Sequence, residues 1–344
     1  MRKRDMQPTS PLRRLFSSVS FWIFAGTFFV RLLVLSRFSG SAHFIPHGDD
    51  MAFYNGWAMR ILEGQFTDGR AFYGLPGYAW VLAGLYAVFG VNSFMPSLLQ
   101  AAMEGITGVC MYRLGVLSFA SKSRNFGRIE SFAPHAIGIV ASVGWIVFLP
   151  TQVFSIILMP TAWLVCAFWF CVWRLAELKN TTIMRPWLGY GVFMGLIAMM
   201  IATILCLIPL FFVAIGRTVG AERLKWSRLG RGLAAAAVLI AGILIGTSPA
   251  WIHNYFVARE PVFLTAHSGI NEWIGNNPEA TGYPRMPPGI RASQEGLLRD
   301  SISVAEIAEG RELTRAEVSA HWSTKAREWR REHFSEWVQL VGVK

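Results

Sequence analysis

Seven long stretches with few charged residues dominate this sequence and restrict what it can fold into. A helix needs roughly 20 apolar residues to cross the hydrocarbon core of a bilayer, and backbone groups there are satisfied only in helices or closed barrels. Barrel strands are about ten alternating residues long, so these continuous stretches predict helices. We therefore expect an all-α polytopic membrane protein with a transmembrane helix bundle. The stretches are residues 16–35, 74–91, 94–118, 132–149, 151–173, 187–215 and 232–252.

The composition agrees with residence in a membrane. Hydrophobic residues make up 53% of the chain and charged residues only 15%, whereas a soluble domain has about 25% charged residues. The net charge of +11 comes mostly from short segments between the apolar stretches, which is typical of cytoplasmic loops. No basic run is interleaved with base-stacking aromatics, so nucleic acid is excluded as a partner. The four cysteines lack metal-ligand spacing, and we expect no metal and no cofactor.

The N-terminal segment is typical of either a signal peptide or an uncleaved first helix. Five basic residues precede an apolar run that starts at Phe16, as in both kinds of segment. The run is about as long as a full span and no small-residue cleavage site follows it. We therefore expect a first transmembrane helix with a cytoplasmic N-terminus, and we expect Arg31 to extend from its far end to the interface.

Two topologies are compatible with the basic loops. If every stretch crosses once, two basic loops fall on the outer side, against the positive-inside tendency. The conflict disappears if 74–91 does not cross fully and 187–215 forms two short or broken helices. Both topologies place Asp49, Asp50 and the segment after Trp251 on the extracytoplasmic side.

The expected organisation follows from these spans. Residues 1–256 form a transmembrane domain whose first extracytoplasmic loop covers about 36–73, and residues 257–344 form an extracytoplasmic segment. Within the first loop, apolar residues at helical spacing predict a helix over 51–62 that lies on the membrane surface. In the second, Thr314 and Glu317 form a capping box, which predicts a helix from Thr314 to Val338. Many Gly and Pro residues predict a loop over 275–290.

Asp49 and Asp50 are the sharpest local candidate for chemistry. Two adjacent carboxylates follow the first helix and precede the surface helix. At the membrane edge a carboxylate can act as a general base on an incoming acceptor, and a pair can hold a divalent cation beside a phosphate. The alternative is helix capping, for which Asp is favoured.

The segment from Ser268 to Gly282 is a second candidate. Its glycines and asparagines tolerate positive φ, which predicts a tightly turning loop. Amide side chains and backbone N–H groups in such a loop can bind sugar hydroxyls or a phosphate. The alternative is a purely structural turn. The candidate residues are Asn271, Gly275, Asn276 and Asn277.

The same segments resemble a known family. "GINEWIGNNPEATG", preceded by "SPAWIHNYFVAREPVFLTA", resembles the loop after a transmembrane helix in bacterial C-type (GT-C) glycosyltransferases, in the group of protein O-mannosyltransferases and lipid A aminoarabinose transferases. "GDDMAFYNGWAMRILEGQ" and "YGLPGYAWVLAGLYAVFG" are similar to its first loop and the following helix. The matched positions there are Asp50, Tyr54, Ala58, Gly64 and Pro76.

The resemblance implies metal-independent sugar transfer from a polyprenyl-phosphate-linked donor to a lipid, glycan or protein acceptor. It implies a multi-pass protein of the cell inner membrane, with transfer on the outer face. It assigns the general base to Asp50 first and Asp49 second, and substrate contacts to Tyr54, His253 and the Asn271–Asn277 segment. His253 stands where relatives often have Arg.

Departures from the family keep two alternatives open. Relatives often carry an acidic residue where this chain has "ILMPTAWLV" and a basic residue where it has "GLIAMMIATILCLIP", so the cation for the donor phosphate is unassigned; Arg31, His253 and Arg259 are substitutes. The chain also resembles a C-terminally shortened member. The departures make one alternative a degenerate, non-catalytic homologue that acts as a membrane scaffold. The other is a transporter or flippase, which predicts charged groups within the spans, and these spans contain almost none.

Overall fold

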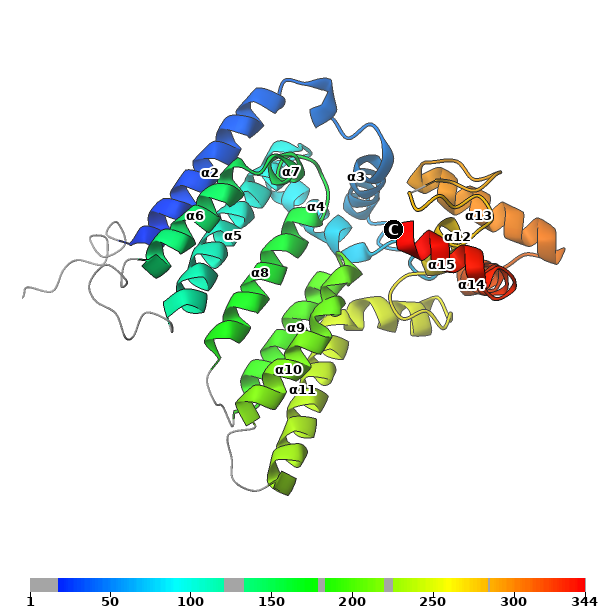
Figure 1. Ribbon diagram of the computed structural model, residues 1–344. Helices are drawn as coiled ribbons and strands as arrows, with labels where there is room; N and C mark the ends of the chain where they lie inside the picture. Colours follow the sequence, from blue (N-terminus) through cyan, green and yellow to red (C-terminus); the bar gives the residue numbers. More distant parts are fainter. Residues whose placement is uncertain (1–17, 121–132, 179–182, 220–224, 284, 344) are drawn as a thin grey trace, which may run out of the picture. The chain divides into compact units, whose positions relative to one another are not determined.

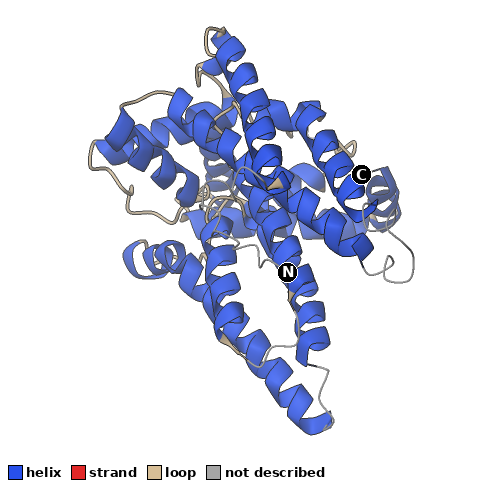
Figure 2. Cartoon of the chain, turned by 90° about the vertical axis from the view of Figure 1, so that its left-hand side faces the viewer, coloured by secondary structure: helices blue, strands red, loops and turns tan. Residues whose placement is uncertain are grey.

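The computed structural model describes residues 18–120, 133–178, 183–219, 225–283 and 285–343, and these form helices with no strand (Figure 2). The all-α fold class expected from the sequence is therefore confirmed. The chain divides into two compact units. The first consists of Met1–Ile45, Asn92–Thr182 and Cys206–Gly232, and the second of Pro46–Val91, Ile183–Leu205 and Leu233–Lys344. Each unit is described by itself.

In the first unit, helix α5 lies at the centre. It packs against α2, α6 and α8, and α2, α5 and α6 lie side by side in Figure 1. Close contact depends on glycine: a Cβ on Gly115 would lie 2.7 Å from the Cα of Gly138, and a Cβ on Gly108 would lie 2.8 Å from Thr27 Oγ1. The helices are α2 (Val19–Phe38), α5 (Phe94–Ala120), α6 (Ala133–Val147), α7 (Leu149–Phe154), α8 (Thr161–Glu177) and α10 (Ile208–Val219), with a 3-10 turn η1 (Ala42–Phe44).

The apolar stretch 151–173 is not one helix, because it is interrupted between α7 and α8. Polar side chains on α5 satisfy the backbone carbonyls that the interruption releases. Gln100 Nε2 donates to the Ile157 carbonyl at 2.8 Å and to the Ser155 carbonyl at 3.2 Å, and Ser97 Oγ donates to the Ile156 carbonyl at 2.8 Å. Irregular backbone in apolar surroundings is tolerated where protein groups take over its hydrogen bonds.

Arg31 does not extend to an interface, so that sequence-based expectation is wrong. Its side chain is fully buried in the first unit, where Nη1 donates to the Ile146 carbonyl at 2.8 Å and Nη2 donates to the Trp145 carbonyl at 3.1 Å. Nη2 also donates to Thr151 Oγ1 at 2.9 Å and lies 3.6 Å from the carboxylate of buried Glu104. The last carbonyls of a helix lack the regular i+4 helical bond; here Trp145 O accepts only the longer backbone bond from Phe148 N at 3.3 Å. A cation is favoured at this end of α6.

In the second unit, α3 packs against α4 and α13, and α14 packs against α12, α13 and α15. An apolar core including Tyr73, Ile270, Leu297 and Trp322 joins the segment after α3 to the three helices α12, α13 and α14. The elements are α3 (Asp49–Leu62), α4 (Pro76–Phe89), α9 (Arg185–Ala198), most of α11 (Lys225–Ile252), the π-helical turn η4 (His253–Val257), α12 (Ser268–Gly275), α13 (Gln294–Glu309), α14 (Arg315–Glu332) and α15 (Phe334–Val343).

Helices α9 and α11 meet along a seam of four glycines. A Cβ on Gly195 would lie 2.5 Å from the Ile243 carbonyl oxygen and 2.8 Å from the Cα of Gly246. Gly191 and Gly242 meet in the same way one turn earlier, with a Cβ on either lying 2.9 Å from the Cα of the other. Small residues four positions apart let two helix backbones approach closely.

The glycine seam predicts that the same Gly→Ala substitution has opposite effects on stability at two positions of α9. Gly195→Ala is expected to destabilise the protein by about 1–3 kcal/mol, because the new methyl group meets backbone atoms that cannot rotate away. Gly189→Ala adds its methyl group to open space and is expected to be stabilising by up to about 1 kcal/mol through helix propensity. Unfolding in detergent micelles measures both, and equal effects of the two substitutions would contradict the seam.

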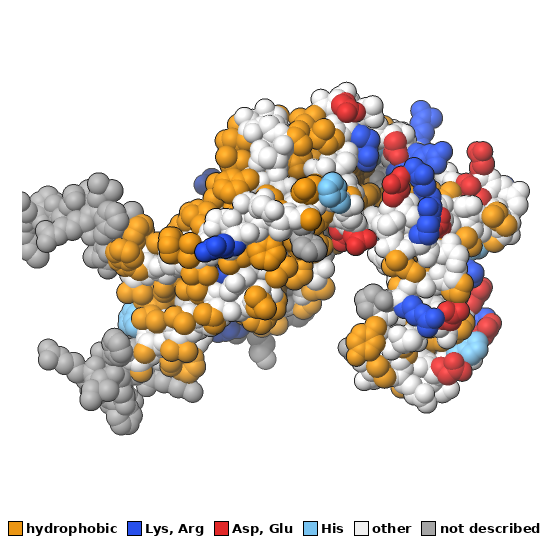
Figure 3. Space-filling view, turned by 90° about the horizontal axis from the view of Figure 1, so that it is seen from above, with side chains coloured by type: hydrophobic (Ala, Val, Ile, Leu, Met, Phe, Trp, Pro, Cys, Tyr) orange, Lys and Arg blue, Asp and Glu red, His pale blue; other side chains and the backbone are white. Residues whose placement is uncertain are grey.

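Within the part of the chain that the structure describes, two helices are long and apolar enough to cross a membrane, Val19–Phe38 and Leu229–Val257. A third span results if Pro76–Phe89 and Phe94–Phe119 count as one. Exposed apolar side chains on α2 include Trp22, Phe29 and Leu33. Figure 3 shows broad surface areas that are mainly hydrophobic. The stretch 74–91 yields only the 14-residue α4, about 21 Å long at 1.5 Å per residue.

The stretch 187–215 is broken, as one of the two topologies requires. It forms α9, a 3-10 turn η3 (Ala202–Leu207) and α10. The number of crossings, the cytoplasmic N-terminus and the division at residue 256 remain predictions.

The local sequence signals in the C-terminal segment predicted some of its helices and missed others. The capping box is confirmed, since Thr314 Oγ1 accepts from Glu317 N and the Glu317 carboxylate accepts from Thr314 N. The helix predicted over 314–338 is instead two helices that meet at His333. Helix α13, from Gln294 to Glu309, was not predicted. The described residues of 276–283 and 285–293 are not helical, in agreement with the loop expected over 275–290.

Candidate functional site

The first turn of α3 holds Asp50 without using it as a helix cap. The N-cap is Gly48, and no side chain caps the helix there, so capping does not explain the two aspartates. Asp50 Oδ1 accepts a hydrogen bond from Gln294 Nε2 at 2.6 Å, across to the first residue of α13. Asp49 is exposed, with φ at +48°, a left-handed conformation that Asp tolerates better than most residues.

Asp50 lies close enough to Tyr54 and His267 for its charge to affect their pKa values. Burial, together with the Asp50 charge, raises the pKa of Tyr54, so its phenol stays protonated. Burial lowers the pKa of His267, while its bond to the Tyr73 carbonyl and the Asp50 charge act in the opposite direction. His267 Nδ1 lies 2.7 Å from the Tyr73 carbonyl oxygen and also contacts the Thr265 hydroxyl. When Nδ1 carries the proton and donates to the carbonyl, Nε2 of the neutral ring carries the lone pair.

A cavity of about 490 Å³ opens within the second unit, between α3 and the ends of α13 and α14. Its walls are mainly aromatic, and its polar groups include two arginines and one aspartate. Phe53 and Leu298, which line it, each lie one turn after the Asp50–Gln294 pair on their own helices. The lining residues are Phe53, Trp57, Arg60, Gly64, Gln65, Thr67, Asp68, Phe72, Tyr73, Gly74, Leu298 and Arg315.

Arg315 is fixed in the cavity wall by its guanidinium group, which binds Asp68 and the Ala71 carbonyl. Nη2 lies 2.5 Å from Asp68 Oδ2, and Nη1 donates to the Ala71 carbonyl at 2.7 Å. The buried carboxylate of Glu260 accepts from Ala71 N at 3.0 Å and from Ala316 N at 2.8 Å. Glu260 therefore ties the segment that bears the aromatic wall to the first turn of α14.

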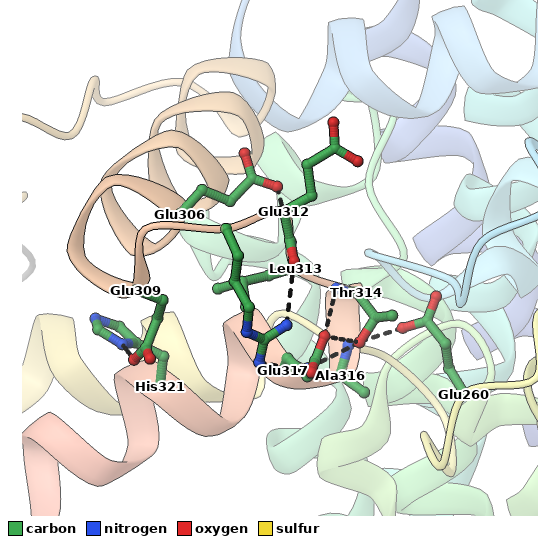
Figure 4. A network of polar contacts seen from close by, with 10 residues as sticks. Glu260, Glu306, Glu309, Glu312, Leu313, Thr314, Ala316, Glu317 and His321 are labelled. Carbon is green, nitrogen blue, oxygen red and sulfur yellow. Dashed lines mark hydrogen bonds and ion pairs between the residues drawn. The ribbon is translucent and has the colours of Figure 1, made fainter.

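The first turn of α14 is anchored further by the turn that precedes it (Figure 4). The Leu313 N–H donates to Glu306 Oε1 at 3.0 Å, and Arg311 Nη2 donates to Glu317 Oε1 at 2.8 Å. Hydrogen bonds from Arg311 and Thr314 lower the pKa of Glu317 to about 2. The position of Arg315 is thus set by contacts on both sides of its helix terminus.

Replacing Glu260 with Gln tests this bridge. The amide keeps one acceptor oxygen but turns an NH₂ group toward a backbone N–H, so one buried donor loses its partner at a cost of about 1–3 kcal/mol. We expect lower thermal stability and faster amide exchange at Ala71 and Ala316, measured by hydrogen–deuterium exchange. Glu279→Gln, at an exposed position in the loop after α12, is the control. Unchanged amide exchange at Ala71 and Ala316 in the Glu260 variant would contradict the bridge.

His253 lies outside the cavity and contacts two of the residues that line it. It begins the π-helical turn η4, is buried, and stacks on Phe72 with ring centroids 4.2 Å apart. Its Nε2 lies 2.6 Å from Thr67 Oγ1. Its neighbour Asn254 accepts from Phe72 N at 2.9 Å and donates to the carbonyls of Val262 and Leu264. His253 therefore acts on the site through two lining residues, Thr67 and Phe72.

The segment from Ser268 to Gly282 is not a continuous loop, because its first half is helix α12. Gly269 serves close packing, not a turn: a Cβ there would overlap the backbone of Ser319 on α14. Gly282 does adopt a positive φ, +89°. The sequence-based interpretation as a tightly turning loop therefore holds only after Gly275.

The two asparagines at the end of α12 already have intramolecular partners. Asn276 Nδ2 donates to the Glu272 carbonyl at 2.7 Å, and its Oδ1 accepts from Trp337 Nε1 at 3.1 Å. Asn277 Nδ2 donates to the carbonyls of Trp273 and Ile274, and its Oδ1 accepts from Glu279 N. They cap α12 and fix the chain beyond it.

The predicted site residues thus fall into two groups. Asp50 and Tyr54 lie together on α3, and His253 lies behind the cavity. Asn271 is exposed on α12, and Gly275 ends that helix. None of the site residues predicted from the sequence, including Asp50, Tyr54 and His253, is among the residues that line the cavity.

Sequence reasoning missed Gln294, His267, Arg60 and Arg315. Ser293 at the N-cap and Gly310 after the last turn are ordinary start and stop signals that would have revealed α13 and hence Gln294. Arg31 is committed to carbonyls and to Glu104 and does not serve as the phosphate-binding cation considered above, whereas Arg259 is exposed.

Comparisons of the chain with protein-family models, with curated proteins and with solved structures returned no match.

Proposed function

We propose that this protein is a membrane glycosyltransferase that moves a sugar from a polyprenyl-phosphate-linked donor to an acceptor on the extracytoplasmic face of the cell inner membrane. Asp50 is the general base that takes the proton from the acceptor hydroxyl. The observation that carries the proposal is the carboxylate of Asp50 held by the neutral amide of Gln294, one helical turn from a cavity of about 490 Å³.

The arrangement suits the chemistry of transfer. A general base must be positioned within hydrogen-bond reach of the proton it removes, and Gln294 restrains the carboxylate without neutralising its charge. The leaving phosphate requires a positive group. Arg60, exposed at the edge of the cavity, is our candidate for it, whereas the charge of Arg315 is compensated by Asp68. Helices long and apolar enough to cross a bilayer favour a lipid-linked donor, because they keep enzyme and donor in the same membrane.

The direct test uses the purified chain in proteoliposomes with radiolabelled sugars on a short polyprenyl phosphate. Transfer of label to an added acceptor, together with release of the polyprenyl phosphate, is the expected result. Absence of transfer across a panel of sugars, from protein that retains its helical circular-dichroism spectrum, would overturn the proposal in favour of a membrane scaffold. Uptake of label into the vesicle lumen without release of the polyprenyl phosphate would instead indicate a flippase.

A further inference from the structure

The cavity between α3, α13 and α14 has walls suited to a sugar ring. Phe53, Trp57, Phe72 and Tyr73 contribute aromatic surface, and the C–H faces of a pyranose are apolar enough to pack against such rings. Gln65, Thr67 and Asp68 contribute polar groups at the exposed side. A few polar groups set in a mainly apolar wall fix the orientation of a small ligand.

The charges in the cavity favour a neutral ligand over a phosphate. Arg315 is paired with Asp68 at 2.5 Å and also bound to the Ala71 carbonyl, so its charge is largely compensated. Arg60 is exposed, where solvent and salt screen its charge. The Asp68–Arg315 pair and Gln65 offer both donors and acceptors in one cavity wall, which sugar hydroxyls can match.

Two buried polar atoms in this wall lack a partner among the described residues. They are Tyr73 Oη and Arg315 Nε. Tyr73 is 7% exposed, and both residues line the cavity. Neither atom has accessible surface of its own. A buried donor without a partner is costly, so we expect the Tyr73 side chain to turn its hydroxyl group toward a sugar hydroxyl when a saccharide binds.

We propose that this cavity binds a neutral saccharide, which in the reaction proposed above is the acceptor. Only the assignment of this saccharide as the acceptor rests on the proposed function. Asp50 and Gln294 lie one turn before Phe53 and Leu298, and one turn rises 5.4 Å, comparable to the width of a sugar ring. A hydroxyl of a sugar bound in the cavity therefore extends toward Asp50, which can remove its proton.

Saturation-transfer NMR tests the binding with the full chain in lipid nanodiscs, because the headgroups of glycoside detergents would compete. The probes are the methyl glycosides of glucose, mannose and galactose, inorganic phosphate, and a hexose on a short prenyl phosphate. We expect saturation transfer to the ring C–H protons of at least one free methyl glycoside, without displacement by millimolar phosphate.

Tyr73→Phe is the most informative variant. If Tyr73 is purely structural, removing its unpartnered hydroxyl should leave the affinity for saccharide unchanged. If the hydroxyl binds the ligand, the substitution is expected to weaken saccharide binding about five- to tenfold, the equivalent of one hydrogen bond. Gln65→Ala, at an exposed position, is expected to weaken binding to a similar degree. Arg299→Ala, an exposed arginine on α13 paired with Glu295, is the control and should change nothing.

Each other outcome rejects part of the inference. No transfer to any free glycoside, or binding that Tyr73→Phe and Gln65→Ala leave unchanged, overturns the saccharide site. Displacement by phosphate, or binding of the prenyl-phosphate hexose alone, overturns the acceptor assignment and marks a donor site. Saccharide binding without any catalysed transfer would leave this site standing while rejecting the glycosyltransferase, so the two failures are distinguishable.

Discussion

Asp50→Asn is expected to lower sugar transfer by roughly 10²–10⁴-fold, the usual contribution of a general base. The substitution keeps the shape of the side chain and the acceptor oxygen that receives the bond from Gln294 Nε2, 2.6 Å away. The fold of α3 and its contact with α13 should therefore persist, and only the ability to take a proton is lost. The measurement is the initial rate of label transfer in proteoliposomes, with the donor saturating.

Asp49→Asn is the matched control. It makes the same chemical change on the adjacent residue, which is exposed and has φ at +48°, a conformation that Asn also tolerates. We expect near-parental rates. Full activity of the Asp50 variant would remove Asp50 from the mechanism. Equal losses in both variants would point to an effect of net charge at the start of α3, not to a single base.

Features encoded over a few residues were predictable from the sequence. The end of α3 at Leu62 and the capping box at Thr314 were predicted correctly, and the start of α3 was predicted two residues late, at Met51 instead of Asp49. These features depend on signals within one or two helical turns. The end of the helix predicted to reach Val338 was wrong because apolar spacing continues across His333 while the backbone does not.

Features that depend on a distant partner were not predictable. Gln294 is 244 residues from Asp50, and nothing in either local sequence indicates the other. Arg315 and Tyr73 meet around the cavity for the same reason. The Asn276–Asn277 segment was interpreted from its composition as a ligand loop, whereas its amides satisfy the end of α12. Composition indicates that such groups need partners, and tertiary structure decides which.

Arg31→Met is expected to destabilise the first unit by about 3–5 kcal/mol, the usual cost of removing one partner of a buried ion pair. Glu104, 1% exposed and 3.6 Å away, would keep a carboxylate without its counter-charge. The carbonyls of Trp145 and Ile146 and the hydroxyl of Thr151 would lose the donors that fix the end of α6. Reversible unfolding in mixed micelles measures the loss, and Arg113→Met, at an exposed position on α5, controls for removing a positive charge.

The double variant Arg31→Met/Glu104→Met separates the two causes. If the unpaired carboxylate dominates, removing it as well restores most of the stability, because a buried ion pair can be replaced by apolar residues at little cost. If the lost hydrogen bonds dominate, the double variant stays as unstable as the single one. The Trp145 and Ile146 carbonyls then keep only the longer bonds from Phe148 N at 3.3 Å and Gln152 Nε2 at 3.2 Å. The 3.6 Å separation of the charged groups, longer than the three hydrogen bonds of 2.8–3.1 Å that Arg31 makes elsewhere, favours the second result. Arg31 would then serve chiefly to end α6 within apolar surroundings, and Glu104 to balance its charge.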